Sequence, residues 1–80
     1  MKLPRDLDGE ELIKRLRPLG YEVVRQSGSH VRLTRIAGEE IHHITIPLHR
    51  PLKIGTLNSI LVDVAAHLRL TRDELLRQLQ

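Results

Sequence analysis

The chain has no cysteine, tryptophan or phenylalanine, and Tyr21 is its single aromatic residue. Without cysteine there is neither a disulfide framework nor a thiolate metal site. Proteins that read single-stranded bases by stacking usually present several aromatic rings, so a base-stacking platform is not expected. If RNA is bound, the phosphate backbone and the duplex shape should supply most of the contact.

Long apolar runs are also missing. No segment resembles a signal peptide or a twenty-residue apolar span, so we expect a soluble cytoplasmic protein with no membrane partner. The 80 residues predict one domain over residues 1–80. A domain of this size buries only about 60 to 65 per cent of the surface that its unfolded chain exposes, so the core must be thin.

The chain carries a small excess of positive charge. Thirteen Lys and Arg against ten Asp and Glu give a formal charge of +3, and the pI is about 10.0. This mild excess is compatible with a polyanionic partner without requiring one. Acidic residues gather near the start of the first predicted helix and at Glu39-Glu40. Basic residues fall across the predicted strands and the loop after them: Arg25, Arg32, Arg35, Arg50 and Lys53.

Apolar spacing predicts helices at both ends of the chain. Asp8-Gly9-Glu10 begins the first, because early acidic residues suit the helix dipole, and Pro18 and Gly20 close it. Thr56 is the expected N-cap of a second, longer helix. The capping box Thr71-Arg72-Asp73-Glu74 then begins a short third helix.

Three antiparallel strands are expected between the helices, over residues 21–26, 31–36 and 41–48. Apolar residues of the second and third strands oppose one another if the strands pair across the turn at 37–40, and these pairings form a consistent core face. The pairs are Ile36 with Ile41, Leu33 with Ile44, and Val31 with Ile46. The predicted fold is therefore α+β, in the order α-β-β-β-α: a three-stranded antiparallel sheet backed by helices, a short extra C-terminal helix, and an open second face.

The same register places His30 opposite Pro47 and diagonal to His49, on the face away from the core with Arg32. Pro47 cannot donate to a ladder and marks an edge or the end of the strand. The first strand is less defined, because Val23 and Val24 compete for the core.

His30 is the main candidate for chemistry. It follows the flexible pair Gly28-Ser29, and imidazole exchanges protons near neutral pH. On an open basic face, His30 could take the proton from an RNA 2′-hydroxyl or protonate a leaving 5′-oxygen without a metal. His49, at about 7 to 8 Å on the diagonal, is a possible second proton-transfer group. The alternatives are an ordinary strand residue after a turn for His30 and a solvated strand end for His49.

Two other patterns, a pair of adjacent histidines and a lysine-glycine segment, give no specific prediction of a metal or nucleotide site. His42 and His43 are adjacent, but neighbours on a strand point to opposite faces, and His43 lies about 20 Å from His49 along the strand. We therefore expect no metal and no other cofactor. Lys53-Ile54-Gly55-Thr56 lacks the glycine spacing of a Walker sequence, so it is either a generic anion site at a helix start or an ordinary loop.

Several segments together resemble the HicA family of toxin mRNA interferases. They are Gly9-Glu10-Glu11-Leu12-Ile13 with Leu16 and Leu19-Gly20-Tyr21, the run 24–33, Thr45-Ile46-Pro47-Leu48-His49, and the run 55–61. The resemblance implies a double-stranded-RNA-binding-domain-like fold and a metal-independent endoribonuclease that cleaves mRNA, with His30 as its catalytic histidine. It also implies a HicB-type antitoxin that covers the active face, and growth arrest when the toxin is free.

Within this interpretation, Gly28 and Ser29 shape the approach to His30, while Arg32 and Lys53 contact the RNA backbone. The alternative is a non-catalytic double-stranded-RNA-binding or protein-interaction module with the same fold. The tail from Val62 onward is longer and more helical than in the shortest members of the family. It is expected either to serve the antitoxin interface or to pack as extra core.

Overall fold

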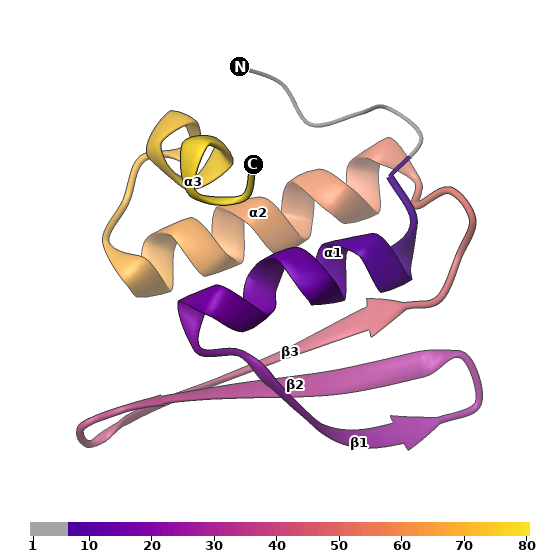
Figure 1. Ribbon diagram of the computed structural model, residues 1–80, viewed down its shortest axis with the longest axis horizontal. Coiled ribbons are helices and arrows are strands. Elements are labelled where there is room, and N and C mark those ends of the chain that lie inside the picture. Colours follow the sequence, from indigo (N-terminus) through magenta and orange to yellow (C-terminus); the bar gives the residue numbers. More distant parts are fainter. Residues whose placement is uncertain (1–6) are drawn as a thin grey trace.

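Helices cover one face of a three-stranded antiparallel sheet, and the other face is open (Figure 1). The computed structural model describes residues 7–80. The elements run α1 (Gly9–Leu16), the 3-10 turn η1 (Arg17–Leu19), β1 (Glu22–Ser27), β2 (His30–Ala37), β3 (Glu40–Pro47), α2 (Ile54–Leu68) and α3 (Arg72–Gln78). This order confirms the expected α+β fold and is consistent with its double-stranded-RNA-binding-domain-like description.

The register between β2 and β3 is the one predicted. Leu33 pairs with Ile44, Val31 with Ile46, and His30 with Pro47, where β3 ends. The Ile36–Ile41 pair also forms, but it lies on the open face, with 69% and 60% of the two residues exposed. Alternation explains the difference, because an even number of residues separates side chains that share a face and Ile36 is three residues from Leu33.

A β-bulge decides how β1 faces the core. Val23 pairs with Leu33 and Arg25 with Arg32, so Val24 is the extra residue between two regular pairs. Val24 is 57% exposed, whereas Val23 shares the face of the buried Leu33. The bulge thereby brings Arg25 to the open face, opposite Arg32.

The core is one thin layer between the sheet and the helices. Tyr21 lies within it and is completely buried. Each leucine-sized side chain that is fully buried contributes about 1.5–3 kcal/mol to folding. The largest fully buried side chains are Tyr21, Leu12, Leu16, Leu33, Ile46, Leu61, Leu75 and Val64.

α2 begins earlier than the sequence suggested, so the assignment of Thr56 as its N-cap is wrong. Lys53 has the extended backbone of an N-cap, and its carbonyl accepts the hydrogen bond from the Leu57 amide at 2.9 Å. Thr56 therefore lies inside the first turn. Lys53 makes no side-chain cap, so the helix start is set by the backbone and not by a polar side chain.

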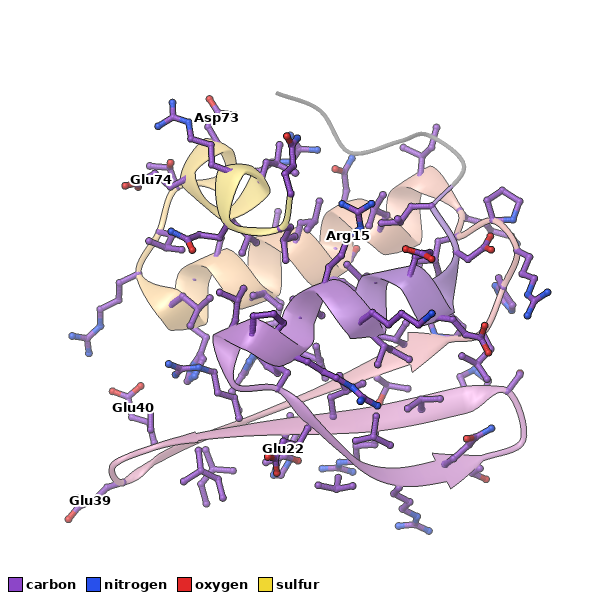
Figure 2. The ribbon with its side chains drawn as sticks, viewed as in Figure 1. Arg15, Glu22, Glu39, Glu40, Asp73 and Glu74 are labelled. Carbon is purple, nitrogen blue, oxygen red and sulfur yellow. The ribbon has the colours of Figure 1, made fainter. Side chains whose placement is uncertain are left out.

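α3 packs as additional core. Its predicted capping box is present: the Glu74 amide donates to Thr71 Oγ1 at 3.1 Å and the Thr71 amide donates to Glu74 Oε1 at 2.9 Å. Leu75, Leu76 and Leu79 are buried. Arg15 reaches from α1 toward α3, where its Nη1 donates to the Leu79 carbonyl at 3.0 Å (Figure 2).

Candidate functional site

The turn before His30 is a two-residue hairpin loop. Ser27, the last residue of β1, pairs with His30, the first residue of β2, and Gly28-Ser29 connects them. Gly28 has φ +57, a left-handed conformation that favours glycine, and a Cβ there would meet nothing within 4 Å. Glycine is thus required by backbone conformation and not by space. The result is an exposed His30 at the tip of the β1–β2 hairpin.

A pair of unneutralised arginines lies beside His30 on the open face. Arg25 and Arg32 are direct cross-strand partners, both are exposed, and neither forms an ion pair with any residue in 7–80. Like charges directly opposite on a sheet are destabilising. An anion bound between these side chains would offset that repulsion. The sequence analysis counted Arg25 among the basic residues of the strands but did not include it in the candidate site, because only the bulge at Val24 fixes its direction.

The acidic residues of the sheet lie mostly elsewhere. Glu39 and Glu40 sit at the β2–β3 turn, at the opposite end of the sheet from the hairpin tip that carries His30 (Figures 1 and 2). These two carboxylates are therefore far from His30, whereas Arg25 and Arg32 lie near it.

His49 lies on the loop next to the hairpin tip. The Leu48 amide donates to the Ser29 carbonyl at 2.7 Å, so this loop continues alongside the turn after β3 has ended at Pro47. The Gly9 amide in turn donates to the His49 carbonyl at 3.1 Å. The His49 side chain is exposed. The loop, and not strand alternation, therefore determines how His49 is presented.

Gly9 holds this loop close to α1. A Cβ at Gly9 would collide with the Pro47 carbonyl and crowd the Leu48 backbone. Pro47 is itself buried, although the sequence placed it on the open face. Its burial follows from the close approach of the first residue of α1. Gly9 therefore has a role in positioning the loop that the sequence did not reveal.

Lys53 lies farther along the same loop, after the cis Arg50-Pro51 peptide bond. It is exposed, and within residues 7–80 no hydrogen bond or ion pair links its side chain to His30 or Arg32. The predicted site residues thus fall into three places: Gly28, Ser29, His30 and Arg32 together on the β1–β2 hairpin, His49 on the adjoining loop, and Lys53 at the start of α2.

A partly buried polar cluster lies under the other end of the sheet, and the sequence analysis assigned it no chemistry. The Tyr21 hydroxyl is 2.7 Å from His42 Nδ1, and His42 Nε2 is 3.1 Å from Asp63 Oδ1. Because the ionised carboxylate only accepts, His42 Nε2 carries the proton, and in the neutral ring Nδ1 accepts from Tyr21. Burial raises the pKa of Tyr21 to about 12. His42 thus connects the sheet to α2.

His67 joins the same cluster from α2. Arg35 Nη1 is 3.3 Å from His67 Nε2, and Arg35 Nε donates to the Leu19 carbonyl at 2.7 Å. Since a guanidinium only donates, His67 Nε2 must accept, which requires the neutral ring. Burial, and then the neighbouring His42 and Arg35, lower the pKa of His67. Arg35, counted above among the basic residues of the strands, therefore has a structural partner on α2.

The two adjacent histidines separate as predicted. His42 enters the Tyr21–Asp63 cluster, whereas His43 is exposed and its Nδ1 lies 2.7 Å from Thr34 Oγ1. Among residues 7–80, no three histidine, aspartate or glutamate side chains converge as ligands of one metal ion. In the same part of the chain, no helix is long and apolar enough to cross a bilayer.

Comparison with known proteins agrees with this architecture. A family model described as HicA toxin of bacterial toxin-antitoxin matches residues 9–65, which include α1, the whole sheet and most of α2. Searches of curated proteins and of solved structures gave no match. The match covers more than half of the chain and contains the His30 hairpin. The chain therefore belongs to the HicA family of toxins, whose role in a toxin–antitoxin system is opposed by an antitoxin partner.

Proposed function

We propose that this toxin is a metal-independent endoribonuclease that cleaves mRNA in the cytoplasm, with His30 as its catalytic residue. The observation that carries the proposal is the exposed imidazole of His30 at a hairpin tip, beside the unneutralised pair Arg25 and Arg32. An imidazole titrates near neutral pH, and guanidinium groups bind phosphate.

The reaction uses the RNA 2′-hydroxyl as the nucleophile. As this oxygen attacks the adjacent phosphorus, a bond from O2′ to phosphorus forms and the bond to the 5′-oxygen breaks. His30 takes the proton of the 2′-hydroxyl, or donates a proton to the leaving 5′-oxygen. Arg32 stabilises the negative charge that develops on the phosphate oxygens. The products are a 2′,3′-cyclic phosphate and a 5′-hydroxyl end.

The remaining predicted residues have supporting roles. Gly28 and Ser29 leave room for the phosphate to approach the hairpin, and Lys53 contacts the RNA backbone farther along. His49 would supply the second proton transfer, because its loop is hydrogen-bonded to the carbonyl of Ser29, next to His30.

A HicB-type antitoxin is the proposed protein partner, and it would cover the open face. Ile36 and Ile41 support this, because they are paired, apolar and exposed on that face. The fully buried centre of a protein interface is apolar and its rim is polar, and an exposed apolar pair bordered by charged residues fits that arrangement. The antitoxin would thereby block access to His30 and to the arginine pair.

The test is cleavage of RNA by the purified protein in the presence of a chelator. Wild type is expected to yield 2′,3′-cyclic phosphate ends, and His30→Ala and His30→Gln are expected to lose at least about 100-fold in rate. Arg77→Gln on α3 serves as the matched surface control. Full activity of His49→Ala would remove His49 from the mechanism. Salt-sensitive RNA binding by wild type without cleavage would instead support the non-catalytic binding module.

Expression in a bacterial host gives an independent measurement that needs no knowledge of the target sequence. Wild type without antitoxin is expected to arrest growth, and His30→Ala is expected to be tolerated. Equal tolerance of both proteins at equal expression would contradict the proposed activity.

A further inference from the structure

A groove of about 350 Å³ opens between β3 and α2, next to the open face. Arg32 and Thr45 line it from the sheet, and Ser59 and Asp63 line it from α2. Its apolar lining is formed by Ile44 of β3 and Ile60 of α2, both less than one-tenth exposed. The proposed reaction uses Arg32 but none of the other groups in this groove.

The groove has opposite charges on its two sides. Arg32 belongs to β2, and its side chain forms no ion pair within residues 7–80. Asp63 lies on α2, and its side chain is 58% exposed. Asp63 Oδ1 accepts from His42 Nε2 at 3.1 Å, whereas Oδ2 has no hydrogen-bond partner in the described part of the chain. One carboxylate oxygen is therefore fixed by the protein and the other is free to accept a hydrogen bond.

We infer that this groove binds one nucleotide of the RNA beside the cleaved phosphate and selects a base with an exocyclic amino group. The inference rests on the proposed function. A nucleotide combines an anionic phosphate, a flat ring and a hydrogen-bonding edge, which correspond to Arg32, the apolar lining and Asp63. The groove volume falls within the range of pockets that bind small molecules.

The position of Arg32 connects the groove to His30. The two residues share a face of β2 and are two positions apart, a separation of about 7 Å along the strand. A single extended nucleotide can span this distance. An RNA strand with one phosphate at His30 would therefore have its neighbouring phosphate at Arg32 and the attached base over the groove.

Asp63 gives the base preference its direction. Cytosine, adenine and guanine each present an amino group that can donate to a carboxylate oxygen, and acidic side chains accept from cytosine N4. Uracil presents its single N–H between two carbonyl oxygens, which repel a carboxylate. Single-stranded RNA is commonly read on this edge. Amino bases should therefore be accepted in the groove and uracil rejected.

Asp63→Asn tests this preference with a minimal change. The asparagine Oδ1 still accepts from His42, while its Nδ2 now donates, which suits the carbonyl O4 of uracil. Mapping of cleavage sites in a random RNA pool should show a loss of about tenfold in preference for amino bases over uracil. Asp73→Asn makes the same change on an exposed residue of α3 (Figure 2) that does not line the groove, and should leave the preference unchanged.

Nucleotide binding gives a readout that does not depend on cleavage. Titration of the 15N-labelled protein with CMP and UMP should shift the Thr45, Ser59 and Asp63 amide signals, with CMP binding more tightly. Ser59→Gln, at an exposed position that does not contact the Tyr21–His42–Asp63 chain, should abolish these shifts by filling the groove.

The outcomes separate the inference from the proposed function. Cleavage with the same base preference in wild type and Asp63→Asn would overturn the inference and leave the function standing. Groove shifts with CMP but no cleavage would contradict the function and support the groove. Loss of antitoxin binding in Ser59→Gln, without any change in nucleotide shifts or base preference, would assign the groove to a protein partner and overturn the inference.

Discussion

His42 of β3 and His67 of α2 stack with ring centroids 4.4 Å apart and an interplanar angle of 18°. The stacked pair joins the end of the sheet that lies away from the β1–β2 hairpin to the second half of α2. Arg35 from β2, Glu40 at the start of β3 and Asp63 from α2 surround it. The contact between sheet and helix at this pair therefore depends on a neutral His67 ring, which accepts from Arg35.

Acidification should destabilise the fold through His67. Its pKa is lowered in the folded protein by burial, and further by His42 and Arg35, so the unfolded chain binds the proton more readily. The free energy of unfolding should fall as the pH drops below about 6.5 and level off below the folded pKa. Urea unfolding between pH 7.5 and 5 measures this.

The control for that measurement is His67→Gln, which keeps an acceptor for Arg35 but does not titrate. Its unfolding free energy should vary less with pH over the same range. An identical pH dependence in the variant and in wild type would show that other groups are responsible.

Tyr21 should resist ionisation, and it can be followed alone because it is the single tyrosine. Burial raises its pKa to about 12 in the folded state, against 10.0 for a free side chain. Stability should therefore decline as the pH rises from about 10 to 12, because the unfolded chain loses this proton first. Ultraviolet absorbance of the phenolate gives the titration, and an ordinary tyrosine titration would contradict the burial argument.

Removing the Tyr21 hydroxyl isolates the hydrogen bond to His42. Tyr21→Phe should lower the unfolding free energy by about 1–2 kcal/mol, because His42 Nδ1 loses its donor in a place where water has little access. The same variant should lose the alkaline decline in stability. Chemical denaturation at neutral and alkaline pH tests both statements together.

Gly9 and Gly55 form a matched pair for alanine substitution. Gly9→Ala should destabilise the protein by about 1–3 kcal/mol, because the new methyl group would collide with the Pro47 carbonyl and displace the His49 loop. Gly55→Ala, in the first turn of α2 with open space around it, should stabilise by about 0.5–1 kcal/mol. Thermal unfolding of both variants measures the contrast, and equal effects would exclude the steric explanation.

Arg25→Gln should separate stability from RNA affinity. Relief of the repulsion with Arg32 should raise stability by about 0.2–1 kcal/mol. Loss of one phosphate contact should weaken RNA binding and reduce the salt dependence of log K by about 0.7–0.9. Binding over a series of salt concentrations, with Arg77→Gln as the control, measures this. An unchanged salt slope would place Arg25 outside the RNA path.

Ile36→Lys should weaken antitoxin binding by about tenfold or more, because it places a charge in the apolar part of the open face. RNA cleavage should be largely retained, since Ile36 lies at the far end of β2 from His30. Val62→Lys, an exposed aliphatic residue of α2, is the matched control. Weaker binding for Val62→Lys alone would move the interface to α2.

The fold could be read from the sequence because its signals are local. The capping box at Thr71, the hairpin turn around Gly28 and the alternation from Ile41 to Ile46 along β3 each depend on neighbours in the chain. The start of α2 was misassigned for the converse reason. Thr56 is a good capping residue by type, but the extended backbone at Lys53 begins the helix three residues earlier than a cap at Thr56 would.

Part of the candidate site could also be predicted from the sequence, and part of it could not. Alternation was enough to predict that His30 pairs with Pro47 and that His42 and His43 diverge, since a strand has a period of two residues. The sequence by itself therefore determined the order of elements, the β2–β3 register and the face that carries His30. Its similarity to the HicA family extends over these same segments.

Only the tertiary structure decided which distant residues meet. A bulge at Val24 turns Arg25 toward Arg32, the missing side chain of Gly9 lets the His49 loop approach α1, and the packing of α2 on the sheet assembles Tyr21, His42 and His67. None of these contacts leaves a periodic pattern, because each joins segments whose separation along the chain is unrelated to their distance in space. The physical reason is that close packing, and not local backbone preference, selects them.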